Sequence, residues 1–153
     1  GVGSTEWSRD ERKRTHIRRR FMQLGQTAAG MQTYDIVRAA TALQSFLKSP
    51  DLAFSLEAEN EAATWALFAS LFIENVDSLT LTNLAPRNRD APDFLNVSRL
   101  VEPPHLVLMS AGRNRTLRIR NGEPWHQQWK TVLADNPLAN TAVQLAATPE
   151  TSD

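Results

Sequence analysis

Apolar and polar residues recur along this chain with two different periods, and the changes between them predict helices and strands in turn. Spacings of three and four residues predict helices, and strict alternation predicts strands. The first helix is expected within ERKRTHIRRRFMQLGQ, where Ile17, Phe21 and Leu24 share one face. Further helices are expected over 33–48, 60–73, 94–101 and 124–134, and strands over 52–57, 77–84, 115–120 and 141–147. The segment HLVLMSA fits a helix or a strand.

The helix expected over 33–48 has the clearest apolar stripe. Its members recur near every 3.6 residues and are Tyr34, Val37, Ala40, Leu43 or Gln44, and Leu47. Thr33 is expected to cap the N-terminus, and Pro50 to stop the helix. The helix expected over 60–73 is apolar on almost every side, which indicates that it is buried.

Strands that alternate with helices predict an α/β fold. We expect a three-layer α/β/α arrangement, in which a mostly parallel sheet has helices on both faces. Residues 1–153 are expected to form one domain, with an irregular arginine-rich segment over 1–30 and the alternating core over 31–148. Because four strands are few for a sheet of this kind, further strands are expected before Gly1. We find no internal repeat in the sequence.

Composition narrows the classes of function. The chain has no cysteine, which excludes disulfides, thiolate metal sites and a cysteine nucleophile. No apolar run approaches the roughly 18 residues of a membrane span, and GVGSTEWSRDE lacks the apolar core of a signal peptide. The formal net charge is zero, but residues 9–20 hold seven of the 17 basic residues, so the remainder of the chain is acidic.

The stretch LAFSLEAENEAATWALFASLFI, residues 52–73, joins a short strand to a long apolar helix through a tight polar turn. An α/β-hydrolase carries its nucleophile on such a turn, in the pattern G-x-S-x-G. The best register places Ala58, Asn60 and Ala62 on the first Gly, the Ser and the second Gly. Ala66 and Leu67 then match the Ala-Leu that often follows in these enzymes.

The chain resembles the C-terminal half of bacterial proteins of the acetyl xylan esterase-like or dienelactone hydrolase-like type, within the α/β-hydrolase superfamily. The resemblance covers most of residues 1–145. Its segments are GVGSTEW, RRRFMQLGQTAAGMQTYDIVRAATAL, ALFASLF and RNRDAPDFLNVSRLVEPPHLVL, and none is a catalytic signature. The resemblance implies an α/β-hydrolase fold, an exported protein and a polysaccharide ester as substrate. The expected partner is the N-terminal remainder of the same protein, or another domain.

A serine esterase needs a nucleophile, a base and an orienting acid. The amide of Asn60 stands at the nucleophile position, and Asn121-Gly122 follows the strand that should precede the acid, with Glu123 next. The base should follow the last strand, where ATPETSD contains no histidine. We therefore predict no catalytic residue, no cofactor-binding residue and no metal ligand in this chain.

Three histidines and four tryptophans remain as candidate functional residues. His16, His105 and His126 have no metal-ligand spacing, and His126 is expected to pair with Glu123 on a helix surface. Sugar-binding sites use exposed tryptophans, but Trp65 is expected in the core, and Trp125 and Trp129 are expected to hold their helix against the sheet. Trp7 precedes the basic segment.

The segment RDERKRTHIRRR, residues 9–20, could bind nucleic acid or another anionic partner. Asp10 and Glu11 interrupt the run, and it contains no aromatic residue that would stack on bases. A salt-bridged face or an interdomain contact is favoured instead. The leading hypothesis is thus a degenerate, non-catalytic hydrolase-like module. The alternatives are part of an active ester hydrolase whose nucleophile lies outside this chain, and a binder of anionic partners through Arg12 to Arg20.

Overall fold

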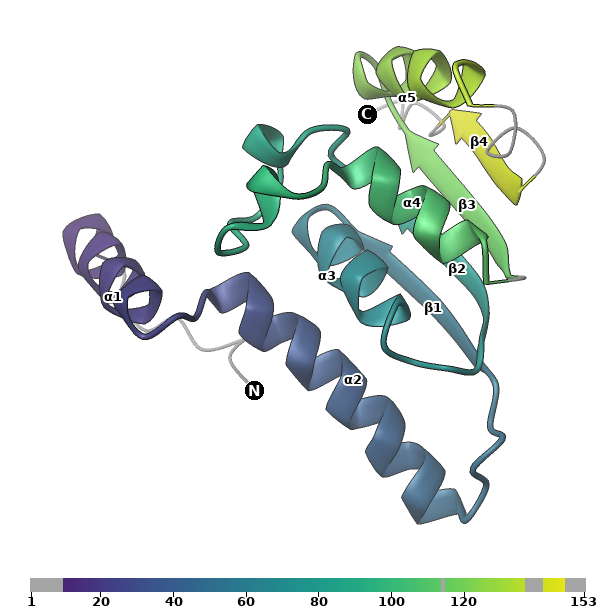
Figure 1. Cartoon of the computed structure of the whole chain (residues 1–153), viewed down its shortest axis with the longest axis horizontal. Coiled ribbons are helices and arrows are strands. Elements are labelled where there is room, and N and C mark those ends of the chain that lie inside the picture. The colour runs from purple at the N-terminus through teal and green to yellow at the C-terminus, as the bar shows by residue number, and fades with distance from the viewer. Residues whose placement is uncertain (1–9, 114, 137–141, 148–153) are drawn as a thin grey trace, which may run out of the picture.

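The computed structural model describes residues 10–113, 115–136 and 142–147, in which helices and strands alternate (Figure 1). The elements are α1 (Glu11–Gln23), α2 (Ala28–Leu47), β1 (Phe54–Glu59), α3 (Glu61–Ser70), β2 (Val76–Thr82), α4 (Pro103–Ala111), β3 (Thr116–Asn121), α5 (Trp125–Ala134) and β4 (Val143–Ala147). The predicted order of helices and strands is confirmed. Across the described ranges, no helix is long and apolar enough to span a membrane.

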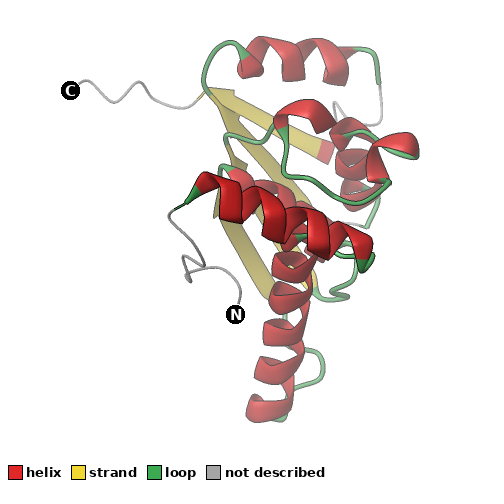
Figure 2. Ribbon diagram, turned by 90° about the vertical axis from the view of Figure 1, so that its left-hand side faces the viewer, coloured by secondary structure: helices red, strands yellow, loops and turns green. Residues whose placement is uncertain are grey.

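The four strands form one parallel sheet in the order β1-β2-β3-β4. Leu79 of β2 lies between Leu56 of β1 and Leu117 of β3 in the register of the sheet. The predicted α/β class, with a parallel sheet flanked by helices, is confirmed. Because each strand neighbours the next one in the chain, right-handed crossovers place the connecting helices on one face of the sheet. Figure 2 shows the helices on that side.

The other face of the sheet carries polar side chains. Its positions alternate with the apolar ones and are Ser55, Glu57 and Glu59 of β1, Ser78 and Thr80 of β2, Thr116, Arg118 and Arg120 of β3, and Gln144 of β4. In a three-layer α/β/α arrangement, a second layer of helices would pack against these polar side chains. Burying charged side chains there would require new partners for each of them.

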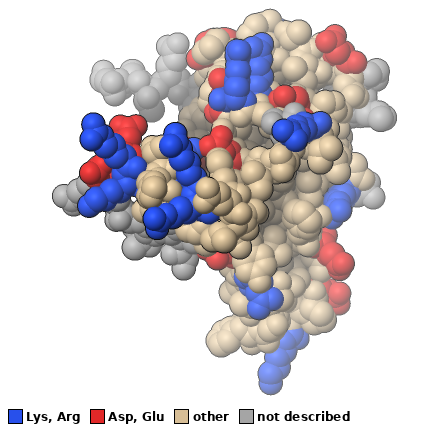
Figure 3. Space-filling view, turned by 60° about the vertical axis from the view of Figure 1, so that its left-hand side comes forward, with Lys and Arg blue, Asp and Glu red and all other residues tan. Residues whose placement is uncertain are grey.

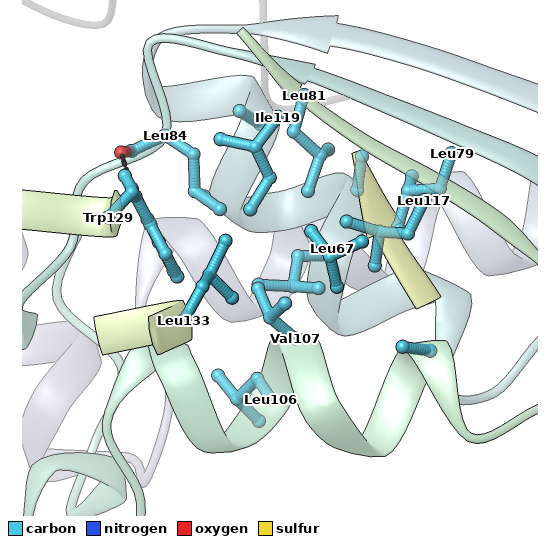
Figure 4. Close-up of a cluster of buried hydrophobic side chains, with 14 residues drawn as sticks. Leu67, Leu79, Leu81, Leu84, Leu106, Val107, Leu117, Ile119, Trp129 and Leu133 are labelled. Carbon is cyan, nitrogen blue, oxygen red and sulfur yellow. Dashed lines mark hydrogen bonds between the residues drawn. The ribbon is translucent and has the colours of Figure 1, made fainter. Parts of the chain in front are cut away.

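The hydrophobic core lies between the sheet and the helical layer (Figure 4). Leu79, Leu81, Leu117 and Ile119 project from β2 and β3 and are fully buried. They meet Leu67 of α3, Val107 of α4 and Trp129 of α5. The predicted burial of the helix after β1 is confirmed, since Ala63, Ala66, Leu67 and Ala69 are all buried. This core fixes the positions of the turns at the carboxyl ends of the strands.

Helix α2 begins earlier than predicted and packs through only part of the predicted stripe. Its cap is Thr27, whose Oγ1 accepts a hydrogen bond from the Gly30 N–H at 3.1 Å, so Thr33 lies inside the helix. The buried residues of α2 are Ala29, Thr33 and Ala40, whereas Tyr34, Leu43 and Leu47 of the predicted stripe are exposed. Val37 and Ala40 of the predicted stripe do face inward, since Ala40 packs with Ala69 of α3 and Val76 of β2, and Ile36 and Val37 pack beside it.

The first predicted helix is confirmed, because α1 lies within ERKRTHIRRRFMQLGQ; the arginine-rich segment over 1–30 is therefore not irregular throughout. Asp10 caps α1 by accepting hydrogen bonds from the Arg12 and Lys13 N–H groups. A later segment differs from its predicted structure. The helix expected over 94–101 is a single 3-10 turn, Val97–Arg99. Asn96 has a left-handed φ of 60°, which prevents a continuous helix there. The ambiguous segment HLVLMSA is helical, within α4.

Candidate functional site

The turn from β1 to α3 has the geometry of a strained strand-to-helix elbow. Its single turn residue is Asn60, with φ 56° and ψ −129°, between the last residue of β1 and the first of α3. The Asn60 N–H donates to the Thr82 carbonyl at 2.9 Å, which holds the turn against the end of β2. Residues other than glycine rarely adopt such a φ, and functional turns are among the places where they do.

The side chain of Asn60 is exposed and bonded to a second asparagine. Its Oδ1 accepts a hydrogen bond from Nδ2 of Asn83 at 3.1 Å. Asn83 also has a positive φ, of 53°, and follows β2 directly. An amide offers no oxygen nucleophile for acyl transfer. Ala58 and Ala62, which the predicted register aligns with the two elbow glycines, are partly buried. The turn therefore has an elbow's shape without its reactive group.

The position expected for the acid holds a structural amide. Asn121, the last residue of β3, is fully buried. Its Oδ1 accepts from the Leu84 N–H at 2.9 Å, and its Nδ2 donates to the Leu84 carbonyl at 2.8 Å. Glu123 is exposed and precedes α5, so the helix-surface pair predicted for it with His126 is wrong. Among the described residues, the position predicted for the acid therefore holds an amide and not a carboxylate.

A short motif repeats at the ends of three strands. Each copy reads Leu-x-apolar-x-Asn, and the copies are Leu56 to Asn60, Leu79 to Asn83 and Leu117 to Asn121. The register of the sheet places the leucines side by side and brings the three asparagines to one edge. Sequence reasoning missed this repeat because the copies are unequally spaced. The signal was nevertheless present, since the asparagine follows the second apolar residue by two positions each time.

The three histidines do not converge. His16 is exposed on α1, and His105 is exposed in the first turn of α4, where its Nδ1 accepts from the Glu102 N–H at 3.2 Å. His126 is half-buried on α5, and its Nδ1 is buried without a hydrogen-bond partner. Residues 148–153, where the base would follow β4, lie outside the described residues. Among the residues described, no cluster of histidine and carboxylate side chains could hold a metal ion.

The tryptophans occupy two environments. Trp129 is fully buried, and its Nε1 donates to the Leu84 carbonyl at 2.9 Å (Figure 4), which confirms that it holds α5 against the sheet. Trp65 does not lie in the core as predicted, because it is half-buried, and its Nε1 has no hydrogen-bond partner. It lines a cavity of about 370 Å³ between α1 and the first turns of α2 and α3. Trp7 lies outside the described residues.

Helix α1 presents its basic side chains to solvent, and none of its residues is buried. Figure 3 shows the Lys and Arg side chains on this side of the molecule, with acidic side chains among them. Arg18 forms an ion pair with Asp93, from the loop between β2 and α4. That pair supports the predicted salt-bridged face for this one arginine.

A buried guanidinium lies at the opposite edge of the sheet from the asparagines. Arg115, just before β3, is 5% exposed, and its Nη1 donates to the Ser70 carbonyl at 2.8 Å. Burial lowers the pKa of Arg115, and the nearby Arg113 lowers it further. Its Nε is buried without a partner. The carbonyl that it binds belongs to the last residue of α3, so Arg115 ties β3 to that helix.

Comparison of the chain with protein-family models, with curated proteins and with solved structures found no match. The resemblance to esterase-like proteins therefore stays a prediction.

Proposed function

We propose that this chain is a non-catalytic module, built on the strand, turn and helix of an α/β-hydrolase elbow, with a structural or accessory role in a larger esterase-like protein. The observation that carries the proposal is Asn60, which occupies the strained turn while its amide bonds to Asn83. The amide of asparagine is not one of the side-chain groups that serve as nucleophiles in covalent catalysis.

The surroundings of the turn support the same conclusion. The acid position holds Asn121, whose hydrogen bonds with Leu84 use both ends of its amide. The histidines of the described residues lie on α1, α4 and α5 and not in the turn that carries Asn60. With neither a base nor a nucleophile at the turn, the chain would act through its surfaces.

The runner-up function is part of an active ester hydrolase whose nucleophile lies outside this chain. The fold is compatible with it, but the polar face of the sheet disfavours it, because a completed hydrolase sheet is covered on both faces. Binding of nucleic acid through α1 is the weaker alternative. The Arg18–Asp93 ion pair and the acidic side chains near α1 reduce the positive potential that such binding would need.

The test is hydrolysis of an aryl acetate by the purified chain, alongside Asn60→Ala. We expect both proteins to release product no faster than buffer alone. Activity in the wild-type chain that Asn60→Ala abolishes would overturn the proposal. Activity that survives Asn60→Ala would also overturn it and would place a nucleophile elsewhere in the chain.

A further inference from the structure

The polar face of the sheet is arranged as an ordered grid of charges and hydroxyl groups. The register places Glu57, Thr80 and Arg118 in one row across β1, β2 and β3. Glu59, Thr82 and Arg120 form the next row. The acids therefore lie on β1, the bases on β3, and the hydroxyl side chains of β2 between them.

Little of this charge is neutralised by strong contacts among the described residues. Arg120 Nη1 lies 3.7 Å from Glu57 Oε1, and the two side chains are 42% and 68% exposed. Exposed pairs of this kind contribute little to stability, so they are easily exchanged for other partners. Arg118 donates from Nε to Gln144 Oε1 at 2.8 Å, which orients its guanidinium without cancelling the charge.

We infer that this face binds the same face of a second copy of the chain, about a two-fold axis that runs parallel to the strands over β2. Such an axis exchanges the two sides of the face, so that β1 of one copy lies opposite β3 of the other. Glu57 then faces Arg118 of the second copy, and Glu59 faces Arg120. Thr80 of β2 meets its own counterpart at the axis, as a self-complementary two-fold interface requires.

The arrangement of charges favours a second copy over an unrelated protein. The rows of one copy lie opposite the same rows of the other copy, without any shift along the strands. Each acid and its facing base occupy the same row, which is a property of the register itself. The side chains are also of suitable size, since stacked sheets lie about 10 Å apart and leave room for these groups. An unrelated partner would need the complementary charges at the same spacing.

The interface is expected to be weak and dependent on salt. Strands lie roughly 4.8 Å apart, so three facing strands cover less area than the roughly 800 Å² per partner of a standard stable interface. Charge pairs dominate the contact, and screening lengths shrink from about 10 Å at 0.1 M salt to about 3 Å at 1 M. The dimer should therefore form at high protein concentration and low ionic strength. The inference goes beyond the proposed function, because a non-catalytic chain need not self-associate.

Sedimentation equilibrium of the whole chain over a range of concentrations tests this directly. We expect a reversible dimer at low salt that dissociates when salt is added. The variant Arg118→Glu/Arg120→Glu has an all-acidic face, and Glu57→Arg/Glu59→Arg has an all-basic one. Each variant alone should be monomeric, because like charges face each other. An equimolar mixture of the two should restore the dimer.

A matched control separates the face from simple net charge. Arg38→Glu/Lys130→Glu changes the net charge as much as Arg118→Glu/Arg120→Glu but lies on exposed positions of α2 and α5. It should remain a dimer alone and should not pair better than wild type with the all-basic variant. Circular dichroism establishes that each variant is folded, and Glu57→Gln/Glu59→Gln provides a milder variant that should weaken the dimer.

Two results would overturn the inference. The first is a wild-type chain that stays monomeric at every concentration in low salt, which would leave the face to solvent or to a different protein. The second is a dimer unaffected by the charge reversals, which would place the interface elsewhere. Neither result bears on ester hydrolysis, so the proposed lack of catalysis is tested separately by the aryl acetate assay.

Discussion

Asn83 donates a hydrogen bond from Nδ2 to Oδ1 of Asn60 at 3.1 Å, joining the carboxyl ends of β1 and β2 through their side chains. Both residues have a positive φ, of 53° and 56°. An asparagine tolerates this conformation better than most residues, because its short polar side chain can bond nearby. The pair explains why the turn can be tight without glycine, and why the group at its apex is an amide.

The backbone at the turn predicts different effects on stability for two substitutions of Asn60. Asn60→Val places a β-branched side chain at a φ of 56° and should lower the free energy of unfolding by about 1–3 kcal/mol. Asn60→Gly removes the steric penalty and should change stability by no more than about 1 kcal/mol. Urea unfolding measures both. Equal stability of the two variants would show that the turn is not held in the strained conformation.

Asn121 should contribute to stability rather than to chemistry. Asn121→Ala removes two hydrogen bonds and leaves the buried Leu84 N–H without an acceptor, so we expect a loss of about 2–4 kcal/mol. The exposed Gln127 on α5 provides the control, since Gln127→Ala should lie within about 0.5 kcal/mol of wild type. Urea unfolding that ranks the two variants equally would contradict the buried network.

Trp129 and Trp125 lie on one helix but should respond differently to truncation. Trp129→Phe leaves a void in the core and removes the hydrogen bond to the Leu84 carbonyl, so it should cost about 2–4 kcal/mol. Trp125 is only half-buried, and Trp125→Phe should cost about 1 kcal/mol or less. Thermal unfolding compares them. Similar losses would indicate that Trp129 is not the residue that fastens α5.

The ion pair between α1 and the loop after β2 should be nearly neutral for stability. Arg18 and Asp93 have side chains that are 63% and 54% exposed, and exposed pairs contribute about 0–1 kcal/mol. Arg18→Ala should therefore change the free energy of unfolding by less than about 1 kcal/mol, with Arg19→Ala as the control on the same helix. A larger loss for Arg18→Ala alone would mean that the pair anchors α1.

The sequence was sufficient to predict the α/β class, because the switch between helical and strand periods is clear from 52–57 onward. Boundaries were less predictable where tertiary contacts decided them. The segment 94–101 is mostly loop, although its local pattern favoured a helix. Phe94, at its start, stacks on Phe68 with ring centroids 4.1 Å apart. Only part of the predicted stripe of α2 packs inward, because Ala40 and Val37 meet α3 and β2 while Tyr34, Leu43 and Leu47 are exposed.

The candidate site was predictable only in part. The register that placed Asn60 at the turn is supported by its strained φ and ψ, although nothing in the composition of the turn signals strain. The bonds that join Asn60 to Asn83 and Asn121 to Leu84 were not predictable, because they depend on which strands neighbour one another. The arrangement of charges on the polar face was also not predictable from the sequence, because each row combines residues from three strands.

The most direct test of the central claim, that this chain carries no catalytic nucleophile, is the intact mass after incubation with a fluorophosphonate. Such reagents modify an activated serine wherever it lies, so the measurement does not depend on the assignment of Asn60. We predict a mass identical to that of the untreated chain. One adduct per chain that forms on the folded protein, but does not form when the protein is unfolded before treatment, would contradict this claim.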